Sequence, residues 1–475
     1  MGILFPFLGG SYTGRSSDLN AQRTINYYLE LDNKEGKSPK ALIGTPGLVG
    51  FANSNRVATV RKMHVFGDSL YAVIGSKVFK STTGGVLTSL GTLGSSSGNI
   101  WMADNGVTGN QLMIVDGSDN KGYIYNQSTE VFGVITDPDF PDASSLTFQD
   151  GFFIVTEAGT QKFFISKSFD GTDWDALDFE STAGEEDDLV SCISDHREIW
   201  FFGTATTEVW YREFTTSFPF GRKIDDIIQR GCGAAASIAR EDNTIFWLDE
   251  QGMARRAVGY VPQIISTPQI HFQWAKYSTF ADAIGYTYIQ EGHTFYVLTF
   301  PTGNATWVYD VSTDEWHERA SYPTPYDNRW RGNCYAFFDN KRLVGDHANG
   351  KIYELDLDTF TDDGKIIKAI RQCQVIHSDR KLVFTDRLEI DHQSGVGLVK
   401  GQGVDPIVVL DWSDDGGQTY SNEHWKSLGK IGEYTKRTYW NRLGRSRNRI
   451  YRETITDPVR RVIVGAMLDA TVGEV

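Results

Sequence analysis

The feature that most constrains the fold is a polar turn leading into a strongly apolar strand, which recurs seven times. The runs begin at Asp68, Asn110, Asp150, Arg197, Asn243, Gly292 and Asn340, so that successive starts lie 40 to 49 residues apart. A second apolar segment follows most of them after a turn, as at Lys77, Gly122, Lys162, Glu208, Ala305 and Lys351. A hairpin that repeats every 40 to 50 residues or so is typical of the four-stranded blades of a β-propeller. We therefore predict an all-β chain with a propeller of seven blades, and six blades as the alternative.

The segments on either side of the repeat differ from it. Residues 1–60 are rich in Gly, Ser and Asn and predict an extended N-terminal arm or small platform without a core of its own. From residue 371 onward, strands such as those at Lys381, Pro406 and Arg461 alternate without the repeat period. This pattern predicts a C-terminal antiparallel β-sandwich at 371–475, with the propeller at 61–370.

Charge and cysteine content exclude some functions. The net charge of -15 argues against a nucleic-acid clamp, which needs clustered Lys and Arg. Residues 371–475 hold 16 basic and 14 acidic residues, so that most of the acidic excess lies before them. Four cysteines far apart predict buried free thiols and folding in a reducing cytoplasm. No run reaches 18 apolar residues, so we expect no membrane anchor.

One short motif raises the question of a sugar hydrolase. Ser413, Asp415, Gly417, Thr419 and Tyr420 fit the Asp-box turn that is best known from sialidase propellers. In that turn the Ser and Asp side chains bond to the hairpin backbone and Gly permits a positive φ, so the role is structural. The sequence has no Arg-Ile-Pro or Arg-Leu-Pro segment of the sialidase kind, and no spacing singles out a Tyr and Glu pair. Metal-ligand spacings and nucleotide-binding loops are also absent. We expect no catalytic residues, no metal site and no cofactor.

The most unusual run is a basic segment near the C-terminus. Seven positive residues and no acidic residue lie between Glu433 and Glu453. In a strand, Arg445, Arg447 and Arg449 would project from one face as a row of planar donors for carboxylates or phosphates. On so acidic a chain, such a ridge predicts a docking surface for a partner, for which the candidate residues are Trp440, Arg442, Arg445, Arg447, Arg449 and Arg452. A solvated sheet face is the alternative.

Two segments resemble a known family. The string from Trp440 to Arg447, shortly after the turn at Asp414 and Asp415, is similar to the C-terminal signature of the packaged-DNA stabilisation, or tail-hub (nozzle), proteins of short-tailed bacteriophages. The stretch from Asn20 to Glu30, followed by the turn at Thr45, Pro46 and Gly47, resembles that family's N-terminal segment.

The resemblance implies a structural virion protein made in the host cytoplasm. It implies a hexameric ring below the portal and its adaptor, which extends the tail tube, retains packaged DNA and conducts it during ejection. A tail needle, tailspike or fibre is a further implied partner, and DNA would pass without specific binding, because an acidic lining repels phosphates. The alternatives are a sialidase-like glycan hydrolase and a monomeric propeller that binds a glycan or peptide.

Overall fold

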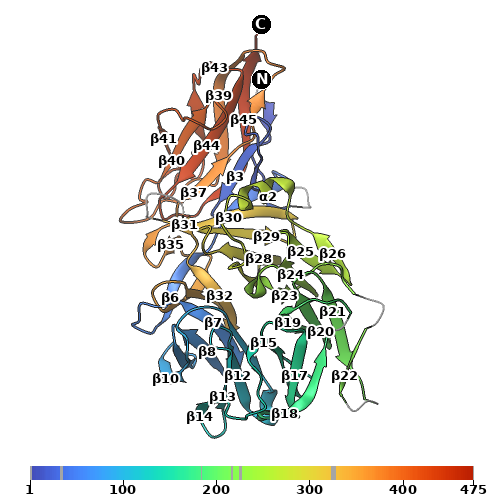
Figure 1. The fold of residues 1–475 in the computed structure, drawn as a ribbon. Coiled ribbons are helices and arrows are strands. Elements are labelled where there is room, and N and C mark those ends of the chain that lie inside the picture. Colours follow the sequence, from blue (N-terminus) through green and yellow to red (C-terminus); the bar gives the residue numbers. More distant parts are fainter. Residues whose placement is uncertain are drawn as a thin grey trace.

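The computed structural model describes residues 3–32, 36–182, 184–214, 218–223, 227–322 and 328–473. A propeller and a sandwich are stacked along one long axis, and the two ends of the chain lie at the tip of the sandwich, far from the propeller (Figure 1). The described helical segments are short: α1 (Gly106–Gly109), the 3-10 turn η1 (Ala235–Ser237) and α2 (Pro268–Trp274). The other regular elements are strands, as the sequence predicts.

The first blades are four-stranded antiparallel sheets in which the order in space follows the order in sequence. Blade one contains β7 (Val60–Phe66), β8 (Ser69–Ile74), β9 (Lys77–Ser81) and β10 (Leu87–Thr92). Blade two contains β11 (Ile100–Asp104), β12 (Gln111–Asp116), β13 (Lys121–Asn126) and β14 (Val131–Val134). Blade three contains β15 (Ala143–Gln149), β16 (Phe152–Glu157), β17 (Lys162–Lys167) and β18 (Asp170–Ser181).

The next three blades follow the same plan. Blade four contains β19 (Leu189–Asp195), β20 (Glu198–Gly203), β21 (Thr207–Arg212) and β22 (Phe220–Arg222). Blade five contains β23 (Ala239–Glu241), β24 (Thr244–Leu248), β25 (Ala254–Val258) and β26 (Val261–Ile264). Blade six contains β27 (Ile284–Gln290), β28 (His293–Phe300), β29 (Ala305–Asp310) and β30 (Glu315–Ser321), and β31 (Asn328–Arg329) pairs with β30.

Blade seven closes the ring with a strand from the N-terminal part of the chain. Its first three strands are β32 (Gly332–Phe338), β33 (Lys341–Asp346) and β34 (Lys351–Asp356). The outer strand is β6 (Gly47–Asn53), which pairs antiparallel with β34. The short strands β35 (Thr361–Asp362) and β36 (Lys365–Ile366) extend this sheet beyond β6. The described residues thus form seven blades, and the prediction of seven is confirmed.

Each apolar run of the sequence repeat forms the second strand of its blade. These strands are apolar along their whole length because neighbouring blades cover both of their faces; every residue of β8, β12 and β28 is buried. In five blades the turn before the second strand has two successive residues with positive φ, as at Asp150 and Gly151. Such turns match the twist of the strands that they join, which explains the polar and Gly residues at these positions.

The sandwich consists of two sheets that share one core. One sheet has the order β4 (Tyr27–Leu31), β5 (Lys40–Gly44), β45 (Val462–Val472), β39 (Val383–His392) and β42 (Thr438–Asn441), with β1 (Ile3–Phe5) on β45 and β43 (Arg445–Ser446) on β39. The other contains β3 (Ala21–Ile25), β37 (Ala369–Gln372), β44 (Asn448–Ile455), β40 (Ile407–Ser413) and β41 (His424–Ser427), with β2 (Tyr12–Thr13) on β3 and β38 (Ile376–His377) on β44. Buried side chains from both sheets, including Tyr27, Leu388, Trp440 and Tyr451, form the core.

The first 60 residues are extended, but their strands are paired within the two larger units. Strands β1, β4 and β5 belong to the sandwich, β3 joins the sandwich to the propeller, and β6 belongs to blade seven. The boundaries after residues 60 and 370 remain a proposed division of the chain. The strands of the N-terminal segment pair with strands of the sandwich and of the propeller, and they form no separate sheet of their own.

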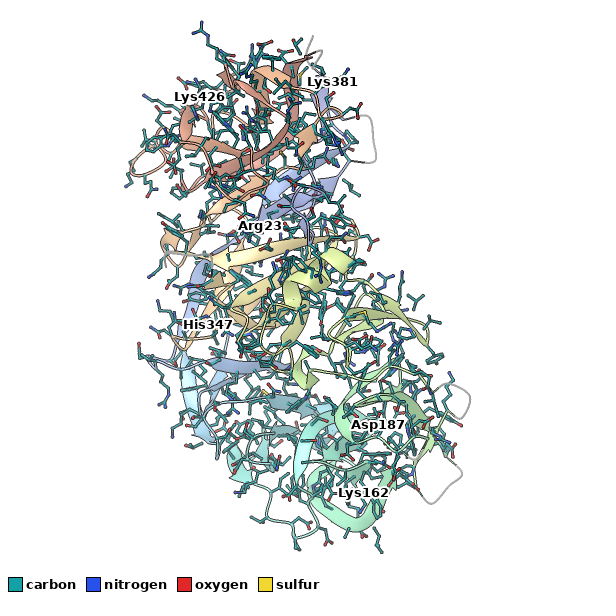
Figure 2. The ribbon with its side chains drawn as sticks, turned by 45° about the horizontal axis from the view of Figure 1, so that its top comes forward. Arg23, Lys162, Asp187, His347, Lys381 and Lys426 are labelled. Atoms are coloured by element: carbon teal, nitrogen blue, oxygen red, sulfur yellow. The ribbon has the colours of Figure 1, made fainter. Side chains whose placement is uncertain are left out.

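One continuous sheet connects the propeller with the sandwich. β3 pairs with β30 of blade six through Ile25 and Glu318, and on its other edge with β37. Arg23 lies at this junction and binds Glu318, with 2.6 Å between Nη2 and Oε2 (Figure 2). Because hydrogen bonds run across the joint, we expect the two units to move together.

Candidate assembly surface and propeller channel

The Asp-box residues form a tight turn between β40 and β41. The amide of Gly417 donates to Oγ of Ser413 at 2.8 Å, and the amide of Thr419 donates to Oδ1 of Asp415 at 2.9 Å. Gly417 has a φ of 90°. Hydrogen bonds from the Ser413 hydroxyl, and then from Thr419, hold the pKa of Asp415 well below its usual range. The polar side chains of Ser413, Asp415 and Thr419 therefore serve the turn itself.

Two of the predicted ridge arginines bind carboxylates of the same sandwich. Arg449 makes a bidentate pair with Asp414, with distances of 2.6 and 2.7 Å, and its side chain is 4% exposed. Arg452 pairs with Asp411 and lies 3.5 Å from the centre of the Tyr420 ring. Both arginines hold β44 against β40 and the turn that follows it. The expectation that Arg449 projects from the same face as Arg445 and Arg447 is wrong.

Trp440 also lies inside the sandwich. It is 3% exposed, and its indole N–H donates to the carbonyl of His424 at 2.9 Å. Its place in the family-like string is explained by the core that both sheets share. We do not retain it as a contact for a partner.

The remaining three arginines form an exposed group, which we call the tip arginines: Arg442, Arg445 and Arg447. Among the described residues, no ion pair involves any of them; Arg447 donates to the carbonyl of Arg380. Figure 1 places β43, which carries Arg445, at the end of the sandwich far from the propeller. The tip arginines thus form an exposed basic group on the sandwich.

The N-terminal family-like segments mark the places where the chain changes sheet. Asn26 has a φ of 57° and lies between β3 and β4, which belong to different sheets. Its side-chain amide donates to the carbonyls of Ala320 and Lys368, at 2.9 and 2.8 Å. Gly47 begins β6, where a Cβ atom would lie 2.3 Å from the carbonyl oxygen of Thr359, so only glycine fits.

Sequence reasoning missed Arg371, a fully buried residue of β37. Its guanidinium donates to the carbonyls of Phe7, Gly9 and Gly10 and to the side chains of Gln22 and Thr24. No carboxylate takes part in these hydrogen bonds, and burial lowers its pKa to about 10. Arg371 therefore fixes the N-terminal segment on the sandwich. A lone arginine within an ordinary strand gives no sequence signal for this role.

The innermost strands of the blades enclose a cavity of about 880 Å³ on the propeller axis. Its charged lining consists of the basic residues Arg61, Lys62, Arg240 and Arg329 and the acidic residues Asp104 and Asp282. The channel is therefore not an acidic conduit. His64 pairs with Asp104 at 2.7 Å, and Arg61 pairs with the buried Asp116 at 3.1 Å.

Other chemical features are few in the described part of the chain. It contains no cluster of three or more His, Cys, Asp or Glu side chains suited to a metal ion, and none of its helices is long and apolar enough to cross a membrane. The four cysteines are free and buried, and burial raises the pKa of Cys192 and Cys373 to about 12. High pKa values suppress the reactive thiolate, so these side chains are packing groups.

Comparison with protein families identifies the chain. The family model for the β-propeller of bacteriophage P22 Gp10 matches residues 3–360, and the model for its β-sandwich matches residues 369–471. The chain belongs to the P22 Gp10 family. The Gp10 family is a structural component of the phage tail that stabilises packaged DNA, and this gives no support to the alternative of a glycan hydrolase. No curated protein matches the sequence.

Several solved structures match the chain weakly. A virginiamycin B lyase from Staphylococcus aureus is 11% identical with a TM-score of 0.44, covering 65% of this chain and 98% of its own. The designed protein Ika8 is 9% identical with a TM-score of 0.39, covering 66% and 100%. PorZ of Porphyromonas gingivalis is 10% identical with a TM-score of 0.39, covering 80% and 46%. Similarity this low carries no inference about activity.

Proposed function

We propose that the protein forms a six-fold ring in the tail of a short-tailed phage. In this proposal the ring binds the portal adaptor, extends the tail tube, retains packaged DNA and conducts it during ejection. The observation that carries the proposal is the match of both family models, which together account for the propeller and the sandwich. The protein acts as a structural part of the virion and not as an enzyme.

The tip arginines are the proposed contact to the adaptor or to a neighbouring subunit. They are exposed, lie near one another in sequence and have no acidic partner among the described residues, whereas the chain as a whole is acidic. A planar guanidinium can bind a carboxylate through two parallel hydrogen bonds, which fixes orientation as well as attraction. In a symmetric ring, each such contact is repeated at every subunit.

The propeller cavity is of small-molecule size, which supports a DNA conduit that runs between the subunits of the ring and not through each propeller. A volume of about 880 Å³ is typical of a pocket for a small molecule, so we place DNA on the axis of the ring and not on the axis of the propeller. The excess of acidic residues before residue 371 suits a surface along which phosphates slide. A tail needle, tailspike or fibre would then bind to the outer or distal faces.

The test changes the charge of the tip arginines together. We expect R442E/R445E/R447E to leave the protein folded and soluble but to prevent its incorporation into tails, so that particles package DNA and then lose it. The matched control, R56E/K365E/K400E, makes the same charge change at exposed positions away from the tip and should assemble normally. Electron microscopy of the particles and their DNA content give the readout. Normal tails with the tip variant would move the contact elsewhere, and a ring of another symmetry would refute the six-fold proposal.

A further inference from the structure

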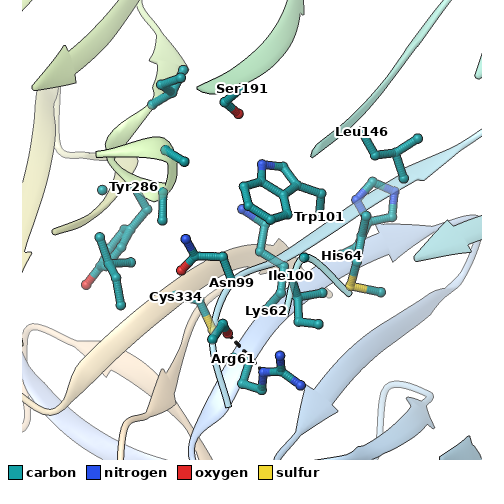
Figure 3. A pocket seen from close by; sticks show the side chains of 18 of the residues that line it. Arg61, Lys62, His64, Asn99, Ile100, Trp101, Leu146, Ser191, Tyr286 and Cys334 are labelled. Atoms are coloured by element: carbon teal, nitrogen blue, oxygen red, sulfur yellow. Dashed lines mark hydrogen bonds between the residues drawn. The ribbon is translucent and has the colours of Figure 1, made fainter. Parts of the chain in front are cut away.

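The cavity on the propeller axis has the size and lining of a ligand pocket. Its volume of about 880 Å³ falls within the range of roughly 300 to 1,000 Å³ that is usual for small-molecule sites. Residues from the innermost strands of several blades meet there, among them Lys62 of β7, Trp101 of β11, Ser191 of β19 and Tyr286 of β27 (Figure 3). The site therefore depends on the assembled ring of blades.

The free charge in this cavity is positive, in contrast to the acidic chain around it. Asp104 is engaged by His64, and Arg61 is engaged by Asp116, which leaves Lys62, Arg240 and Arg329 against Asp282. A concave site with a net positive charge concentrates ions of the opposite sign. An anion is thus favoured inside, even though the outer surface repels it.

Lys62 is the cavity residue whose charge most needs a bound partner. Its side chain extends into the cavity near Trp101 (Figure 3), and no hydrogen bond or ion pair reaches its ammonium group from the described residues. Burial lowers the pKa of Lys62, because the cavity offers the charge less solvation than bulk water does. Lys62 is half-buried, and an ammonium group held away from bulk water without a partner is unfavourable, a cost that an anion in the cavity would remove.

Neutral donors and an apolar wall complete the site. The side chains of Asn99 and Ser191 also line the cavity, and neither takes part in a hydrogen bond with another described residue. Ile100, Trp101 and Tyr286 supply apolar and aromatic surface beside them. We propose that the propeller channel binds a small organic anion, whose carboxylate or phosphate group contacts Lys62 and whose apolar part packs against Trp101.

The test measures binding of two simple probes to the full chain. Succinate and inorganic phosphate are titrated separately by calorimetry, which distinguishes a carboxylate ligand from a phosphate ligand. We expect at least one of them to bind, and K62M to weaken that binding by about tenfold or more, since a charge-assisted hydrogen bond is lost. K62R should retain binding, and K400M, which removes an exposed lysine, should leave it unchanged.

A second readout separates loss of the site from loss of the fold. A ligand that binds only the folded protein raises the thermal midpoint, so the probe should stabilise the original chain and K400M but not K62M. Circular dichroism in the absence of probe establishes that K62M is folded. Failure of both probes to bind, or binding that K62M leaves unaltered, would overturn the proposal. Its outcome is independent of ring formation, which depends on the tip arginines.

Discussion

Arg452 and Asp411 face each other across paired strands and form a bidentate ion pair on the outer face of their sheet, where the side chain of Arg452 is 30% exposed. Nε of Arg452 lies 3.0 Å from Oδ1 of Asp411, and Nη2 lies 2.6 Å from Oδ2. The two residues are direct partners in the register of β44 and β40. The pair therefore stabilises the pairing of β40, which leads into the Asp-box turn, with the centre of its sheet.

Removal of this pair should loosen β40 locally. We expect R452M to lower the free energy of opening at β40 by about 1 to 3 kcal/mol, the range for a hydrogen bond to a charged group that is only partly shielded from water. D411N should have a similar effect, and the double variant should cost less than the sum of the two. Native-state hydrogen exchange of the β40 amides measures this. Additive effects would mean that the pair contributes nothing of its own.

A second prediction concerns His293, which joins blade six to the sandwich. Its Nδ1 lies 2.8 Å from Asp310 and its Nε2 lies 2.9 Å from Glu30 of β4. Burial opposes the charge, but the hydrogen bonds and charges of Asp310 and Glu30 outweigh it and raise the pKa to about 8. Since the ordinary value is about 6.5, the stabilisation is fully present below that pH and is lost as the pH rises through 8.

The measurement compares thermal midpoints at several pH values. The original chain should lose stability between about pH 6.5 and 8, in the region where only the folded state binds this proton. H293Q should be less stable below pH 6.5 and should lack this part of the pH dependence. E30Q, which keeps His293 but removes one of its two carboxylate partners, should reduce this pH dependence. An unchanged slope in H293Q would show that another group is responsible.

Asp362 should give a pH dependence of the same direction from a different cause. It is buried beside β6, and no hydrogen-bond donor of the described residues reaches its Oδ1. Burial raises its pKa to about 7, against the opposing charges of Arg331, Arg319 and Arg461. Between its ordinary value near 4 and about 7, only the folded state holds the proton, so stability falls as the pH rises through this window. D362N should remove this slope, which thermal midpoints from pH 4 to 8 would detect; a slope that persists would contradict the assignment.

A fourth prediction tests the closure of the propeller by β6. Leu48 is 1% exposed and pairs with Leu355 of β34, whereas its neighbour Val49 is 39% exposed. L48A should destabilise blade seven by about 2 to 5 kcal/mol, because it removes a buried side chain and leaves a cavity. V49A on the same strand should change stability by less than about 0.5 kcal/mol. Limited proteolysis at β6 is the measurement, and equal cleavage of both variants would refute the role of Leu48.

The sequence predicts the propeller well because its signal is local and repeated. Each second strand is buried between blades, so a hairpin of continuous apolar character recurs at a regular interval, as at Asp150 and Asn243. The closure by β6 could not be predicted in this way, because β6 and β34 are about 300 residues apart and neither sequence indicates that it pairs with the other. The same holds for Arg371, whose partners at Phe7 and Gly9 are remote in sequence.

The basic ridge was only partly predictable because the chain does not continue as one strand. β43 ends at Ser446 and pairs with β39, whereas β44 begins at Asn448 and pairs with β40. This change of sheet breaks the alternation between Arg447 and Arg449. Arg447 stays exposed and Arg449 enters the sandwich, a distinction that spacing alone does not contain.

The last prediction uses this difference directly. R449E would place a carboxylate beside Asp414 in a site where the present side chain is 4% exposed, so it should cost about 3 to 5 kcal/mol and reduce the yield of soluble protein. R447E, two residues away and exposed, should change stability by less than about 0.5 kcal/mol. Thermal midpoints of the two variants measure these changes in stability. If R449E melts with the original chain, Arg449 is free for an external partner; if it does not, a loss of infectivity in any variant that includes R449E reports on folding and not on the assembly surface.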